Sequence, residues 1–82
     1  MGPMPRYFFD TEDSRLAFRD QEGVEFDDRA RAQAAATIAV GDILRTYLPN
    51  MGSAESQFVM KVRDREGPVC EITVSYSMRT YD

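Results

Sequence analysis

The stretch DDRARAQAAATIAVGDILRTYL, Asp27 to Leu48, decides the fold, because it is the one long helical segment that the sequence predicts. Alanine, the best helix former, recurs along it. Asp27 or Asp28 can cap its first turn by accepting hydrogen bonds from the free backbone N–H groups there. We expect the helix to be closed by three residues beyond its end: Pro49, Asn50 and Gly52.

Two sides of this helix carry small or apolar residues. The side expected to face a sheet holds, at helical spacing, Gln33, Ala36, Thr37, Val40, Leu44, Tyr47 and Leu48. A second side holds Ala34, Ala35, Ile38 and Gly41. This second side is either the edge of a wide core stripe or a docking surface for another chain, because a helix that is apolar nearly all round must be covered.

Alternating residues before the helix predict two strands. The aromatic run from Arg6 to Asp10 is typical of a strand. The segment from Arg15 to Asp20 alternates, and we expect Leu16 and Phe18 to be half-buried on one face. Residues 24–26 continue this second strand after a turn.

Two more strands are predicted after the helix. In residues 56–64, Phe58, Met60 and Val62 alternate with more polar neighbours. Residues 68–78 show the clearest period of two, and five side chains are expected to face inward there: Cys70, Ile72, Val74, Tyr76 and Met78.

These elements predict an α+β fold of the form ββαββ, a four-stranded antiparallel sheet with one long helix packed on one face. The helix returns the chain, so the strands before and after it run the same way. An antiparallel sheet then requires the order 2-1-3-4, with the aromatic strand inside. We expect a single small domain over residues 4–82, and Met1-Gly2-Pro3 resembles an expression remnant ahead of the natural start at Met4.

The motif Arg-Asp-x-Glu-Gly occurs twice, in FRDQEG (18–23) and VRDREG (62–67). A short loop built on a type I turn favours Asp at its start, because the carboxylate can bind N–H groups ahead, and Gly at its end, where φ is positive. We therefore interpret Asp20 with Gly23, and Asp64 with Gly67, as structural turns. A pair of catalytic or cation-holding carboxylates is the alternative, but exposed carboxylates keep ordinary pKa values.

Composition excludes several functional classes. The net charge is −4, and basic residues are interleaved with acidic ones, so neither nucleic acid nor an anionic membrane is an expected partner. A nucleic-acid role would require a cluster on one sheet face of Arg6, Arg15, Arg19, Lys61, Arg63 and Arg79. Cys70 is the only cysteine, which excludes an internal disulfide and favours a reducing cytoplasm.

Residue types that carry chemistry are scarce. The chain has no histidine, the commonest general base and metal ligand. Cys70 shares its parity with Ile72 and Val74, so we expect a small core residue and not a nucleophile. No glycine-rich phosphate loop is present. The sequence therefore predicts no catalytic residue, no metal site and no cofactor, and a protein that is not an enzyme.

The opening MPRYFFD (4–10), the central DQEGVEFDD before an alanine-rich helix, and the late VRDREG together resemble a family of short uncharacterised alphaproteobacterial proteins that is classed as a domain of unknown function. The resemblance spans nearly the whole chain after Met4, but its motifs are turn and core residues. It implies the same fold and a cytosolic bacterial protein, and it transfers no catalytic or binding residue.

We expect a small non-enzymatic module that binds a protein partner or a second copy of itself through the apolar helix. A regulatory domain that binds a small ligand or cation is the alternative, and it would use five acidic residues: Asp10, Glu12, Asp13, Asp20 and Glu22. An enzyme with carboxylates or Cys70 in a hidden pocket ranks third.

Overall fold

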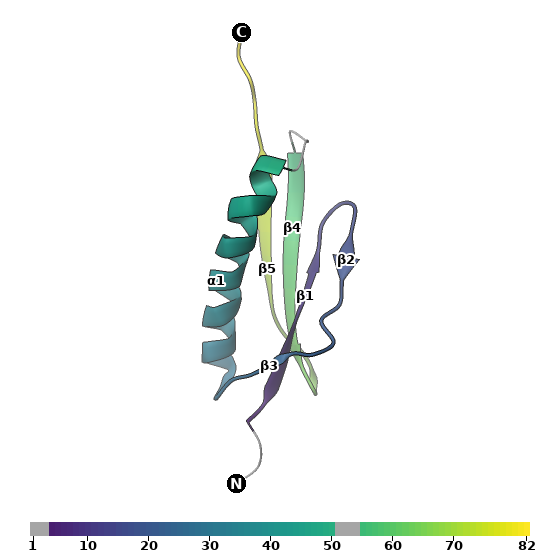
Figure 1. Cartoon of the computed structure of the whole chain (residues 1–82), viewed down its shortest axis with the longest axis vertical. Helices are drawn as coiled ribbons and strands as arrows, with labels where there is room; N and C mark the ends of the chain where they lie inside the picture. The colour runs from purple at the N-terminus through teal and green to yellow at the C-terminus, as the bar shows by residue number, and fades with distance from the viewer. Residues whose placement is uncertain (1–3, 51–54) are drawn as a thin grey trace.

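The computed structural model describes residues 4–50 and 55–82 of the chain. The expression remnant proposed for residues 1–3, and Gly52, which was expected to help close the helix, lie outside the described residues. Figure 1 shows one long helix beside an open sheet of extended strands. The elements in chain order are β1 (Arg6–Glu12), β2 (Ala17–Phe18), β3 (Val24–Glu25), α1 (Arg29–Tyr47), the 3-10 turn η1 (Leu48–Asn50), β4 (Glu55–Asp64) and β5 (Gly67–Ser77).

The sheet is antiparallel and has the order β2-β1-β4-β5, with β3 also paired to β1. This confirms the predicted α+β fold and the predicted interior position of the aromatic strand. The predicted second strand differs in one respect, because it is divided into two short pieces. β2 pairs with the end of β1 at Thr11 and Glu12, whereas β3 pairs with its start at Arg6 and Tyr7.

The helix begins where an aspartate can cap it. Asp28 is the N-cap, with an extended backbone, and its Oδ1 accepts a hydrogen bond of 2.9 Å from the backbone N–H of Arg31. Of the two predicted capping residues, Asp27 and Asp28, the structure therefore has Asp28 as the N-cap. At the other end, the Asn50 side chain donates to the carbonyl of Thr46 at 2.7 Å, which satisfies one of the free carbonyls of the last turn.

The core lies between α1 and the sheet. Its buried residues are Tyr7, Ala32, Ala36, Val40, Phe58, Met60 and Val62. The predicted inward row of β4 is confirmed, since Phe58, Met60 and Val62 are at most 6% exposed. Ala32 and Ala36 are completely buried, so the helix approaches the sheet through methyl groups.

The predicted sheet-facing stripe of α1 is wrong on one flank. Gln33 and Thr37 are exposed, and the Thr37 hydroxyl donates to the Gln33 carbonyl at 3.0 Å. The buried stripe is centred on Ala32, Ala36 and Val40 instead. Positions 33 and 37 lie one residue beyond that line, about 100° round the helix, so they turn away from the sheet.

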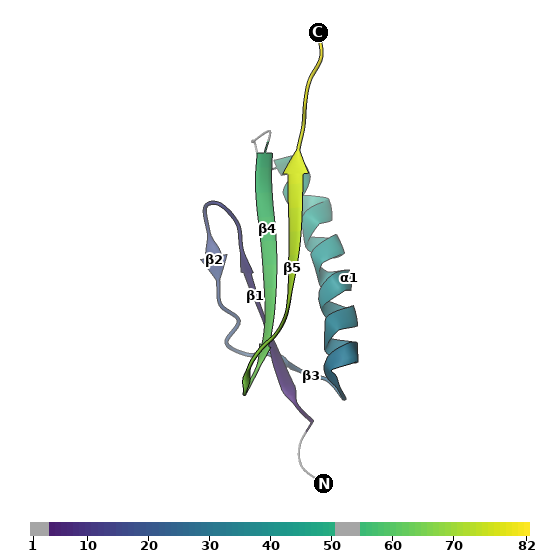
Figure 2. The same ribbon diagram turned by 180° about the vertical axis from the view of Figure 1, so that it is seen from behind.

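The predicted burial of the second strand is also wrong. Leu16 is 76% and Phe18 is 64% exposed, and β2 is only two residues long. β2 is the edge strand on the side of the sheet that α1 does not cover (Figure 2). Met78, which was expected to face inward, follows the end of β5 and is 60% exposed.

Candidate functional site

An apolar groove lies between α1 and the β1–β2–β3 side of the sheet. It has a volume of about 400 Å³. Its lining residues are Phe9, Thr11, Phe18, Val24, Phe26, Ala35, Ala39, Ile43 and Met60. The floor is packed, because the rings of Phe9 and Phe26 meet edge to face at 6.0 Å between centroids. The groove is thus a preformed apolar surface depression next to the core.

Exposed apolar side chains accompany the groove. Phe18 and Ile38 are 64% and 67% exposed, and Val24 and Ile43 are 49% and 38% exposed. Monomeric proteins rarely expose large apolar side chains in a contiguous group, and such groups commonly mark interaction sites. We use the term apolar surface for the groove residues Phe18, Val24, Ala35, Ala39 and Ile43 together with the neighbouring Ile38.

The predicted docking side of the helix contributes to this region. Ala35 lines the groove, whereas Ile38 is not among the lining residues and lies about 60° further round α1, toward its outer side. Ala34, Ile38 and Gly41 are exposed, so they do not form the edge of the core stripe. Their use as a docking surface stays a prediction. The contributions of Phe18, Val24 and Ile43 were missed, because their position depends on how β2 and β3 fold against β1.

The repeated motif forms the same turn twice. In each copy one carboxylate oxygen accepts two backbone hydrogen bonds, from the residues two and three positions ahead. Asp20 Oδ1 binds the N–H groups of Glu22 and Gly23, both at 3.1 Å. Asp64 Oδ1 binds those of Glu66 and Gly67, at 2.8 and 3.1 Å. Both glycines have positive φ, +69° and +135°, as the turn interpretation requires.

The two copies differ in their surroundings. Asp64 starts the β4–β5 hairpin, whereas Asp20 lies in the connection between β2 and β3, which both pair with β1, so this second turn does not close a hairpin. The second oxygen of Asp20 accepts the N–H of Phe9 at 3.1 Å, and the Asp20 N–H donates to Asp10 Oδ1 at 2.9 Å. The expectation that both carboxylates are fully exposed is therefore wrong, since Asp20 and Asp64 are both partly buried.

Arg63 completes this network from β4. Its Nε donates to Asp10 Oδ2 at 2.8 Å, and one terminal nitrogen donates to the Asp20 carbonyl at 2.7 Å. The guanidinium also lies 4.5 Å from the ring centroid of Phe8. One arginine thus ties β4 to β1 and to the β2–β3 connection. No local pattern in the sequence could identify this contact, because Asp10 and Arg63 are 53 residues apart.

The acidic residues of this network are held in their ionised form. Burial raises the pKa of Asp10, but hydrogen bonds from Arg63 and from the Asp20 N–H lower it by more, so the net shift is downward. The pKa of Asp20 is lowered in the same way, since the hydrogen bonds from Phe9, Gly23 and Glu22 outweigh its burial. Neither carboxyl group has the raised pKa that a general acid needs near neutral pH.

Asp13 has an internal role as well. Its Oδ1 accepts the N–H groups of Arg15 and Leu16, and its Oδ2 accepts the hydroxyl of Tyr47. The backbone hydrogen bonds are the main cause of its lowered pKa. Within residues 4–50 and 55–82, no group of three or more His, Cys, Asp or Glu side chains is placed to hold a metal ion.

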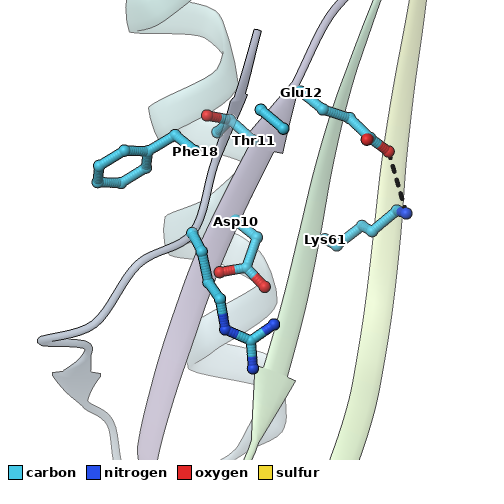
Figure 3. Close-up of a pocket in the computed structure, with 7 residues that line it drawn as sticks. Asp10, Thr11, Glu12, Phe18 and Lys61 are labelled. Carbon is cyan, nitrogen blue, oxygen red and sulfur yellow. Dashed lines mark ion pairs between the residues drawn. The ribbon is translucent and has the colours of Figure 1, made fainter.

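The sheet face opposite α1 is charged. Figure 3 shows Glu12 of β1 and Lys61 of β4 joined by an ion pair, with 3.0 Å between Oε1 and Nζ, while the Phe18 ring points away from them. The basic residues here are paired with acids, as in Arg63 with Asp10 and Arg6 with Glu25. This pairing leaves little net positive potential for the phosphate groups of a nucleic acid.

Cys70 is half-buried on β5 and packs against the core. Burial raises the pKa of its thiol, which keeps the group protonated and poorly nucleophilic near neutral pH. Its position fits the predicted structural role.

The comparisons with known proteins bear on the family and not on an activity. Neither the curated proteins nor the solved structures include a significant match to the chain. Along residues 4–50 and 55–82 no helix has both the length and the apolar character needed to cross a membrane. The model of one protein family, described as Domain of unknown function (DUF6894), matches residues 6–75, which cover every strand and the helix except the end of β5. The chain belongs to this DUF6894 family.

Proposed function

We propose that this protein is a small non-enzymatic module that binds a protein partner through the apolar surface. The observation that carries the proposal is a groove lined by exposed apolar side chains from both β2 and α1, Phe18 and Ile43, with the exposed Ile38 next to it on the outer side of α1. Removing such side chains from water supplies roughly 25 cal/mol per Å² of apolar area, which is the main driving force of association.

The shape of the site favours a protein segment over a small molecule. Small-molecule sites usually enclose most of the ligand and place a few polar groups against it. Here the groove is open, and the Thr11 side chain is its only polar one. A partner segment that presents two or three apolar side chains would fill the groove and cover Phe18, and where it extends over α1 it would cover Ile38 as well. The module would act in a reducing compartment such as the cytoplasm, in keeping with its single cysteine.

The alternative of a cation-binding regulator has weaker support. It requires carboxylate oxygens that are free to bind an ion, but Asp10, Asp13 and Asp20 use theirs for backbone, arginine and tyrosine donors. A cation would have to displace these hydrogen bonds.

The experiment is affinity capture from an extract of the source cells with quantitative mass spectrometry. Wild-type protein is compared with Ile38→Asp and Phe18→Asp, which place a charge on the apolar surface. Tyr81→Asp is the matched control, since Tyr81 is 79% exposed in the C-terminal tail, away from the groove. Circular dichroism and urea unfolding confirm that the variants are folded.

The proposal predicts that proteins retained by wild type and by Tyr81→Asp are lost with both Ile38→Asp and Phe18→Asp. Retention of the same proteins by all four would show that the partners, if any, bind elsewhere, and would refute the proposal.

A further inference from the structure

The two edges of the sheet are very different. The β2–β3 edge consists of two strands of two residues each, interrupted by the Asp20 turn. The opposite edge is β5, an uninterrupted strand of 11 residues that, among the described residues, pairs with β4 alone. A long open edge presents unpaired backbone N–H and C=O groups to any other strand, and proteins normally protect it with charges, prolines or short strands.

β5 carries little of that protection. Pro68 lacks an N–H and interrupts a ladder near the hairpin end, but from Val69 to Ser77 the only charged residue is Glu71. The apolar row of this strand is also incompletely covered. Cys70, Ile72 and Val74 are half-buried, whereas their β4 neighbours Val62, Met60 and Phe58 are buried.

We propose that β5 pairs antiparallel with β5 of a second copy, giving a symmetric dimer with one continuous sheet. The segment that Pro68 leaves available, residues 69–77, has its centre at Thr73. A two-fold axis there places Thr73 opposite Thr73 of the second copy. It places Ile72 opposite Val74, and Glu71 opposite Ser75, so the apolar row stays on the helix side of the sheet and no like charges meet.

The choice of a second copy over an unrelated peptide rests on this self-complementarity. A register centred on Glu71 would oppose two carboxylates, and one centred on Ile72 would draw Pro68 into the ladder opposite Tyr76. The register centred on Thr73 avoids both and pairs every residue from Val69 to Ser77.

The position of α1 agrees with this arrangement. Ala35 and Ala39 turn toward the β2 side, so the opposite flank, with Gln33 and Thr37, lies toward the β5 edge. The helix contacts both β4 and β5. Two such helices would lie about two strand spacings apart, roughly 10 Å, which is a normal distance for packed helices. The exposed Gln33 and Thr37 would then face the second helix.

Cysteine cross-linking tests the register. In a Cys70→Ser background, Thr73→Cys places two thiols directly opposite each other, with Cα atoms about 4.5–5.5 Å apart, a span that a disulfide bridges. Ser75→Cys is the matched control on the same face of the strand. Its two copies would be four residues out of register, about 13 Å apart, which is too far for a disulfide.

Charge substitution provides a second test, by sedimentation equilibrium. Thr73→Lys brings two ammonium groups together across the axis and should weaken dimerisation roughly two- to fivefold. Ser75→Lys places each new ammonium group opposite Glu71 of the other copy and should strengthen dimerisation by a similar factor. Lysine at position 73 and lysine at position 75, on the same face of β5, are thus predicted to have opposite effects on dimerisation.

The inference is upheld if wild-type protein dimerises, Thr73→Cys cross-links in preference to Ser75→Cys, and the two lysine variants shift the dimer in opposite directions. It is overturned by a strict monomer at 100-micromolar concentration, by equal cross-linking at both positions, or by lysine effects of the same sign. It stands independently of the proposed function, since β5 and the groove lie at opposite edges of the sheet, and loss of partner capture in Ile38→Asp would leave the dimer intact.

Discussion

Arg63 on β4 binds Asp10 on β1, with 2.8 Å between Nε and Oδ2, and the same guanidinium reaches the backbone carbonyl of Asp20. The two side chains are about four-fifths buried, at 23% and 19% exposure. The pair therefore differs from an ordinary surface ion pair, because it also fixes the path of the β2–β3 connection.

Arg63→Lys should destabilise the protein by about 1–2 kcal/mol, because lysine keeps the charge but cannot bind the carboxylate and the carbonyl at once or stack on Phe8 in the same way. Urea unfolding followed by circular dichroism measures the change. Lys61→Gln is the control, since the Lys61–Glu12 pair is exposed on the same sheet face, and its loss should leave the free energy of unfolding nearly unchanged. Equal losses in the two variants would contradict the assigned role of Arg63.

The two repeated turns provide a matched comparison of one motif in two environments. Asp20→Ala removes three backbone hydrogen bonds at a partly buried carboxylate, and we expect a loss of about 2–3 kcal/mol. Asp64→Ala removes two, without a third bond to a neighbouring strand, and should lose about 1 kcal/mol or less. Unfolding midpoints at constant m-value measure both. A larger loss at Asp64 would show that the network around Asp20 is not stabilising.

Replacing either of two glycines by alanine should change the free energy of unfolding, in opposite directions for the two positions. Gly41 lies inside α1 with nothing within 4 Å of an added Cβ, so Gly41→Ala should stabilise the protein by roughly 1 kcal/mol. Gly23 has φ +69°, and an added Cβ would lie 2.9 Å from Arg6 Cγ and from the Phe8 ring. Gly23→Ala should therefore destabilise by at least about 1 kcal/mol. Thermal unfolding of the two variants measures both changes in stability. A stabilising Gly23→Ala would refute the turn geometry.

Stability should decrease in acid. The pKa values of Asp10, Asp13 and Asp20 are lowered in the folded protein, so the folded state binds fewer protons than the unfolded state as the pH falls. The stabilisation is fully present above the unfolded value near 3.8 and is lost as the pH falls through the folded values. The free energy of unfolding should thus drop below about pH 4. Asp20→Asn should flatten this dependence, and an unchanged slope would contradict the assignment.

Local sequence patterns predicted much of this fold. Strand alternation identified Phe58, Met60 and Val62 as core, and the repeated Asp-x-Glu-Gly identified both turns, because each depends on neighbours within a few residues. Features that depend on contacts between residues far apart in the sequence were not predicted. The arginine network depends on the register of β1 against β4, and the exposure of Leu16 and Phe18 depends on which sheet edge the helix leaves open.

The apolar surface was predicted only in part for the same reason. The helical period predicted Ala35 and Ile38 as part of a docking side, because a helix that is apolar nearly all round must be covered. Phe18 and Val24 looked like strand core, and only the pairing of β2 and β3 with opposite ends of β1 places them beside the groove.

Site-specific photo-cross-linking tests the central claim, binding of a protein through the apolar surface, most directly. A photoreactive phenylalanine analogue replaces Ile38 in one purified variant and Glu66, exposed at the β4–β5 hairpin, in another, and each is irradiated in an extract of the source cells. We predict a discrete heavier adduct from position 38 that excess wild-type protein competes away and that position 66 does not form. No adduct from position 38, or the same adducts from both positions, would contradict the account.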